Sequence, residues 1–146
     1  MKNLILSLLI FASTAYMAQA PKQDNVKPDL TSLTLLEDVT LSLKGLTVES
    51  SITQEQLIPL KQLELKGENA SNYKIIYYRF KTNYKHTFSQ DEFFDNVINE
   101  AMTLFFTDLE KNCKLTYEDV VVKHTETGKS YKLAPLSVIV KVELKK

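Results

Sequence analysis

Apolar and polar residues alternate along several short stretches of the chain, as they do in strands that bury one face. Gly, Asn and Pro separate many of these stretches and mark turns. Strands joined by short turns pair in an antiparallel manner, so the pattern predicts a largely antiparallel sheet. The expected strands lie within residues 33–48, 63–66, 73–85, 119–125, 130–134 and 136–145.

One segment changes from this alternation to the spacing of an amphipathic helix. Ser89 and Glu92 form a capping box, and apolar residues then recur at helical spacing without Gly or Pro. We therefore expect one long helix over about residues 89–112, packed on the sheet in a single α+β domain that spans residues 30–146. A second capping box, Thr53–Gln56, predicts a single helical turn.

The strand around residues 73–86 combines aromatic and cationic side chains and contains no acid. Alternation places Ile76, Tyr78 and Phe80 on the face that meets the helix. The opposite face grades from apolar to basic along the strand, which suits contacts with another protein. It supplies the candidate partner surface, which consists of Tyr77, Arg79, Lys81 and Lys85.

The predicted helix is rich in phenylalanine, which permits two interpretations. The rings either fill a core against the sheet or line a cavity for a small apolar ligand. The helix face has few small residues, and this favours a filled core. The candidate lining residues are Phe94, Ile98, Phe105 and Phe106.

The N-terminus has the layout of a secretory signal peptide, with Lys2, a short apolar run and small residues before a cleavage site. Residues 1–20 are the expected signal peptide, cleaved after Ala20 or after Ala15, and residues 21–29 are a flexible lead-in. The chain should therefore be exported, to the periplasm or the outside, with no stable membrane anchor after cleavage.

A single cysteine, Cys113, means that packing rather than internal disulfides holds the exported domain. The sequence leaves open whether this thiol is buried or joins another chain. The chain has 18 basic and 18 acidic residues, so no net charge draws it to nucleic acid. His86 and His124 lack partners at metal-ligand spacing, and no catalytic motif is present, so we expect neither metal nor cofactor.

These observations favour a non-enzymatic interaction protein of the cell envelope. An inhibitor, an immunity-type protein, a chaperone or a small assembly subunit would each fit, and each implies a protein partner. The alternative is a carrier of a small apolar ligand between helix and sheet. An enzyme of an unrecognised type is the third hypothesis.

Overall fold

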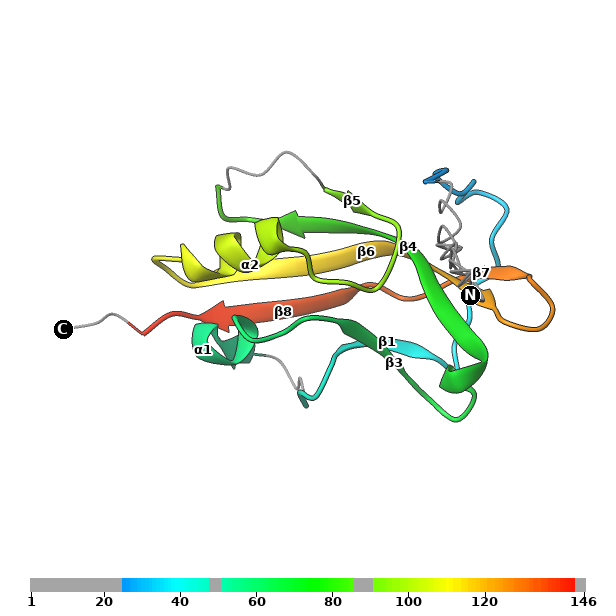
Figure 1. The fold of residues 1–146 in the computed structure, drawn as a ribbon, viewed down its shortest axis with the longest axis horizontal. Helices are drawn as coiled ribbons and strands as arrows, with labels where there is room; N and C mark the ends of the chain where they lie inside the picture. The colour runs from blue at the N-terminus through cyan, green and yellow to red at the C-terminus, as the bar shows by residue number, and fades with distance from the viewer. Residues whose placement is uncertain (1–24, 48–50, 86–90, 144–146) are drawn as a thin grey trace, which may run out of the picture.

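The computed structural model describes residues 25–47, 51–85 and 91–143, and most of this part is β-sheet (Figure 1). The expected signal peptide, Ser89 and His86 lie outside the described residues. A six-stranded sheet has the order β2-β8-β6-β4-β5, with β7 also paired to β6, and β1 and β3 form a separate two-stranded sheet. The strands are β1 (Thr40–Leu43), β2 (Ser51–Thr53), β3 (Leu63–Lys66), β4 (Tyr73–Thr82), β5 (Glu92–Phe93), β6 (Cys113–His124), β7 (Ser130–Lys132) and β8 (Leu136–Lys141).

The α+β class is confirmed, but the prediction of a largely antiparallel sheet is wrong because the larger sheet is mixed. β2 pairs in a parallel manner with β8, whereas β4, β5, β6 and β7 pair antiparallel. Nearly the whole domain separates β2 from β8 in sequence, so no short turn dictates their relative direction. Alternation of apolar and polar residues is the same in both kinds of pair and cannot reveal this difference.

The prediction of one long helix over residues 89–112 is also wrong. The helix in this region, α2, spans only Glu100–Thr107. It begins at Asn99, whose side chain accepts a hydrogen bond of 2.9 Å from the backbone N–H of Met102. Asn99 therefore acts as the N-cap, well inside the segment that was expected to be helical.

The residues before α2 are extended because they pair with other parts of the chain. Within β5, Phe93 lies opposite Tyr78 of β4, and the two rings stack with centroids 4.9 Å apart. The backbone N–H of Ile98 then donates to the carbonyl of Lys61, at 2.9 Å. This segment also has apolar residues at helical spacing, and the tertiary pairing outweighs that local preference.

The single helical turn predicted at Thr53–Gln56 is confirmed as helix α1 (Gln54–Leu57), with both hydrogen bonds of the capping box in place. The side chain of Gln54 also reaches the end of α2. Its amide nitrogen lies 2.8, 3.0 and 3.1 Å from the carbonyl oxygens of Phe106, Thr107 and Leu109. These carbonyls have no partner within the helix, so Gln54 caps α2 from outside.

The two sheets and both helices share one hydrophobic core. The rings of Phe105 and Phe106 on α2 contact Phe80 of β4, with centroids 5.9 and 6.3 Å away. Tyr117 of β6 packs against Phe80 at 5.3 Å and is fully buried. Among the described residues its hydroxyl has no hydrogen-bond partner, which is uncommon for a buried polar group.

Irregularities in the β4–β6 pairing change which side chains reach the core. The register shifts between Ile75 and Tyr77 and again between Tyr77 and Arg79. At the second shift, Asp119 of β6 has a φ of 52°, a left-handed conformation that Asp tolerates better than most residues. Ile75 therefore takes the core position expected for Ile76, which is only half-buried.

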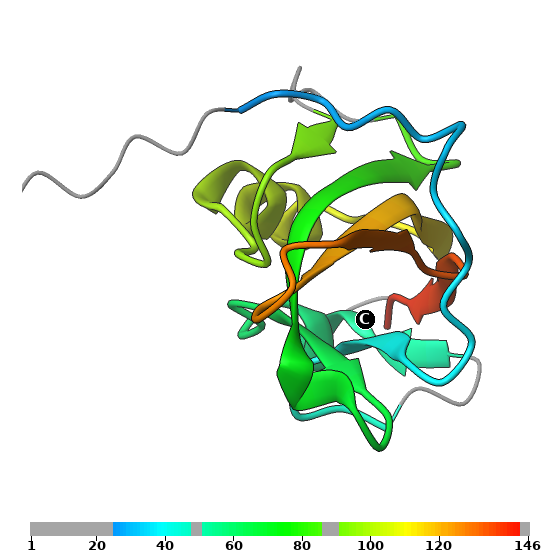
Figure 2. The same ribbon diagram turned by 90° about the vertical axis from the view of Figure 1, so that its right-hand side faces the viewer.

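Residues 25–36 run along the side of the sheet opposite α2 (Figure 2). The ammonium of Lys27 lies 2.6 Å from the carboxylate of Glu92 on β5. Farther along, Leu36 donates its N–H to the carbonyl of Lys132 on β7, and Lys132 donates to Thr34. These contacts tie Lys27, in the expected lead-in, and residues 34–36 of the domain to two strands of the sheet.

β3 and β4 follow each other in sequence but are not paired. The connection contains Gly67, with φ +136°, and the 3-10 helix η1 (Ala70–Asn72). A Cβ at Gly67 would lie 2.1 Å from the backbone oxygen of Asp38, so only glycine fits this close approach. The wide turn sends β4 away from β3 instead of forming a hairpin.

Candidate interaction surface on the outer sheet face

The side chains of β4, β6 and β8 that point away from α2 define a surface that we call the outer face. Along β6, Cys113, Leu115 and Tyr117 are buried in the core, so the residues between them point to the other side. The same alternation applies to β8, where Val138 and Val140 are buried. The outer face consists of Arg79, Lys81, Lys114, Thr116, Glu118, Ser137, Ile139 and Lys141.

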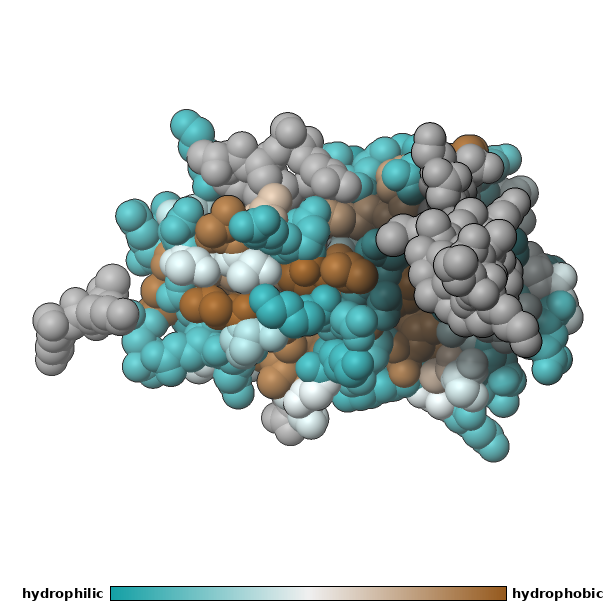
Figure 3. Space-filling view, viewed as in Figure 1, coloured by the Kyte–Doolittle hydropathy of each residue, from teal (hydrophilic) through white to brown (hydrophobic). Residues whose placement is uncertain are grey.

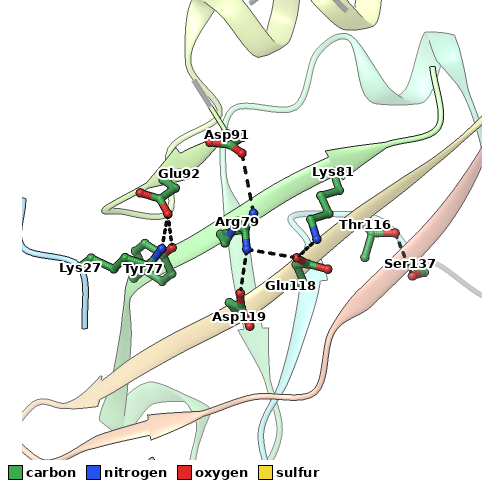
Figure 4. Close-up of polar contacts among 10 residues, drawn as sticks. All are labelled: Lys27, Tyr77, Arg79, Lys81, Asp91, Glu92, Thr116, Glu118, Asp119 and Ser137. Atoms are coloured by element: carbon green, nitrogen blue, oxygen red, sulfur yellow. Dashed lines mark hydrogen bonds and ion pairs between the residues drawn. The ribbon is translucent and has the colours of Figure 1, made fainter. Parts of the chain in front are cut away.

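Arg79 lies at the centre of a charged cluster at one end of this face (Figure 4). Its guanidinium nitrogens are 3.9 Å from Asp91, 3.8 Å from Glu118 and 3.5 Å from Asp119. Lys81 forms a second ion pair with Glu118. The charges of Arg79 and Lys81 are therefore balanced by acids of the same domain.

Tyr77, the first residue of the candidate partner surface, is fully buried. Its hydroxyl donates a 2.9 Å hydrogen bond to Glu92, which also accepts a hydrogen bond from Lys27 (Figure 4). The ring of Tyr77 contacts the ring of Phe94, with centroids 5.5 Å apart. Burial and the bond to Glu92 raise the pKa of Tyr77. The bonds from Lys27 and Tyr77 lower the pKa of Glu92. Tyr77 thus anchors neighbouring segments to the sheet.

The exposed members of the candidate surface are not gathered in one place. Lys81 is half-exposed within the charged cluster, and Lys85 is exposed beyond the end of β4. The structure places Arg79 beside Lys81 on the outer face, whereas it moves Tyr77 out of contact with solvent. Of the four residues, only Arg79 and Lys81 therefore lie together on a surface that solvent reaches.

The other end of the outer face carries a group of residues that the sequence did not single out. Ile139 of β8 is 49% exposed and pairs in register with Lys114 of β6, and Lys141 follows on the same strand. Within the described residues, neither lysine has an acidic partner. Beside them, the hydroxyls of Thr116 and Ser137 lie 3.2 Å apart. This group forms an apolar centre with a cationic rim.

The four candidate ligand-lining residues do not surround a common space. Ile98, Phe105 and Phe106 belong to the core, whereas Phe94 packs against Tyr77, whose side chain is directed to the other face of the sheet. Phe105 and Phe106 contact each other at 5.8 Å as well as Phe80. This ring packing fills the space between α2 and the sheet, so it lends no support to a carrier function.

His124 and Cys113 both have structural surroundings. The Nδ1 atom of His124 accepts hydrogen bonds from the backbone N–H groups of Glu126 and Thr127, each at 3.3 Å, and so stabilises the turn between β6 and β7. Cys113 is a free thiol at the buried start of β6, and burial raises its pKa. Its burial removes the opportunity for an exposed intermolecular disulfide in the native fold.

Within the described ranges, no group of three or more His, Cys, Asp and Glu residues is arranged to hold a metal ion. In the same part of the chain, no helix is long and apolar enough to cross a membrane. Comparisons of the chain with models of protein families and with curated proteins find no match.

Proposed function

We propose that this protein is an exported, non-enzymatic interaction protein of the periplasm or the cell exterior, acting as an inhibitor, an immunity-type protein, a chaperone or a small assembly subunit. It binds an acidic surface of a protein partner through its outer face. The observation that carries this proposal is the exposed Ile139 between Lys114 and Lys141.

An exposed isoleucine on a rigid sheet suits a protein contact because an apolar anchor gains free energy when a partner removes it from water. The two lysines add attraction to acids of the partner and speed the encounter, and they disfavour basic partners. The Arg79 cluster lies beside this group and is internally neutralised by Asp91, Glu118 and Asp119. The attractive charge of the outer face is therefore concentrated around Ile139.

In the test, a photo-crosslinking amino acid takes the place of Ser137 in the protein produced in its native host. The crosslinked partner is then identified by mass spectrometry. A double variant, Lys114→Glu with Lys141→Glu, should reduce the crosslink yield at least about tenfold. The control, Lys61→Glu with Lys129→Glu, makes the same change of charge at exposed lysines outside β4, β6 and β8. Equal yields from the two double variants would exclude the outer face as the interface.

Export is tested separately by cell fractionation and by sequencing the N-terminus of the purified protein. Cleavage after Ala20 gives a chain that begins at Pro21, and cleavage after Ala15 gives one that begins at Tyr16. A chain that keeps Met1 and remains in the cytoplasm would contradict the proposed compartment.

A further inference from the structure

A groove of about 260 Å³ lies between the first half of β4 and the edge of β3 that faces away from β1. Its lining includes Leu63, Leu65, Ala70, Tyr73 and Ile75. Apolar surface is visible in Figure 3 at the place that separates β3 from β4 in Figure 1. The groove also borders Glu64, Lys74 and Asn96, so it is a mixed apolar and polar slot with a strand on either side.

The β3 side of the groove presents backbone groups that have no partner. Leu63 donates its N–H to the carbonyl of Asn96, at 2.8 Å, and its own carbonyl accepts the Asn96 side chain, at 3.2 Å. Backbone groups of alternate residues point to the same side of a strand, so those of Leu65 also point away from β1. Within the described residues, no group pairs with Leu65 on that side.

Within the described residues, the first half of β4 is also unpaired on the side away from β6. The carbonyl of Asn72, immediately before β4, accepts from Thr125 next to β6, at 2.8 Å. By alternation, the N–H and C=O of Ile75 point away from β6, towards the groove. β5 pairs with β4 only at Tyr78 and Arg79, so it does not reach Ile75. Two strand edges thus face one groove.

The chain cannot close this groove by itself because Gly67 and η1 hold the two strands apart. Gly67 packs against the backbone of Asp38, and the side-chain amide of Asn69 donates to the Asp38 carboxylate, at 3.2 Å. Unpaired backbone groups beside apolar side chains are costly, and a strand that enters between them supplies the missing partners. The splayed geometry therefore favours an extended occupant.

We propose that the β3–β4 groove binds an extended peptide segment of a protein partner by strand addition. The segment has apolar side chains at alternating positions and an acidic residue beside Lys74. Lys74 lies opposite Lys123 in the β4–β6 register, and neither has an acidic partner within the described residues. Glu64, which also lines the groove, is paired with Lys66 at 3.3 Å.

The test titrates the protein, produced from the full chain, with the peptide acetyl-Thr-Val-Asp-Val-Thr-Val-amide and follows backbone amides by NMR. The amides of Leu65 and Ile75 should shift and exchange more slowly with solvent. A peptide with an N-methyl group on the central valine loses a backbone donor and should bind about tenfold more weakly. Equal binding of both peptides, or shifts confined to other residues, would overturn the proposal.

Two variants locate the binding site. Ala70→Phe fills the groove and should abolish the shifts, whereas Ser71→Phe, an exposed neighbour on the same turn, should preserve them. Lys74→Glu is an exposed change that spares the core, and it should weaken binding roughly two- to fivefold. Unchanged affinity in both Ala70→Phe and Lys74→Glu would refute the assignment.

This inference is independent of the outer face, and its test separates the two proposals. The double variant Lys114→Glu with Lys141→Glu should leave binding of the valine peptide unchanged. Conversely, Ala70→Phe should leave crosslinking from the outer face unchanged. Loss of peptide binding in the double variant would show that the peptide binds around Ile139 and would overturn the groove proposal.

Discussion

Removal of a single buried oxygen atom should make this protein more stable. The hydroxyl of Tyr117 is fully buried between rings of the core, and in the part of the chain that the structure describes it has no hydrogen-bond partner. Burial raises its pKa, so the group stays a neutral phenol that has given up its bonds to water. An unsatisfied buried polar group costs about 1–3 kcal/mol.

Tyr117→Phe removes this cost and keeps the ring that packs against Phe80. Part of the gain is lost because the atoms that touched the oxygen lose dispersion contacts. We therefore expect the free energy of unfolding to rise by about 1 kcal/mol, the lower end of that range. For a domain of this size, the change corresponds to a rise in Tm of about 4 °C.

Two neighbouring tyrosines are matched controls for the same substitution. Tyr78 is also fully buried, but its hydroxyl lies 3.4 Å from the carbonyl of Val97, so Tyr78→Phe should be mildly destabilising. The Tyr77 hydroxyl donates to the carboxylate of Glu92, at 2.9 Å, and charge-assisted bonds are stronger. Tyr77→Phe should therefore cost the most of the three.

The assay is equilibrium unfolding in urea, with the free energy extrapolated at a fixed slope for all three variants. The expected order of stability is Tyr117→Phe above the unsubstituted protein, followed by Tyr78→Phe and then Tyr77→Phe. A loss of stability in Tyr117→Phe as large as that in Tyr77→Phe would mean that the Tyr117 hydroxyl has a partner, and the reasoning would fail.

Three further predictions concern the caps, turns and thiol of the fold. Gln54→Glu places a carboxylate against the carbonyl end of α2 and should cost about 1–2 kcal/mol, whereas Gln56→Glu keeps the capping box of α1 and should be neutral in the same urea assay. In Gly67→Ala the added Cβ meets the Asp38 backbone, and the variant should lose about 3 kcal/mol or more of stability. In Gly45→Ala the added Cβ meets no described atom within 4 Å, so the loss should be only about 1 kcal/mol. Equal shifts of Tm in the two variants would contradict this contrast. At pH 8, Cys113 should react with a thiol reagent at least about a hundredfold more slowly in the native than in the unfolded protein. Burial raises the pKa of the thiol and limits access of the reagent, so comparable rates would refute the burial of Cys113.

The features that the sequence predicted well depend on residues close together in the chain. The capping box of Thr53–Gln56 involves one turn of backbone, and it forms as expected. The helix expected over residues 89–112 failed because Phe93 pairs with Tyr78 of β4 and Ile98, a member of the expected helical stripe, bonds the backbone of Lys61. Spacing alone does not show that such long-range pairing is available.

The candidate surface was limited by the same kind of information. Strict alternation identified Tyr77 as a member of the face opposite the helix, but it could not show that Glu92 and Phe94 enclose this ring. Ile139 did leave a signal, since it is an apolar residue in the polar register of an alternating strand. Its importance emerges only when the β6–β8 pairing places Lys114 beside it.

The position of β8 in the sheet has a consequence for the order in which the protein acquires its fold. Among the described residues β8 is the last strand, yet it lies between β2 and β6, so within this part of the chain β2 has no other neighbour in the sheet. Contacts between such distant segments form slowly because a long loop must close first. The β2–β8 pair should therefore form late in folding, after the antiparallel β6–β7 pair, whose strands lie close together in the chain.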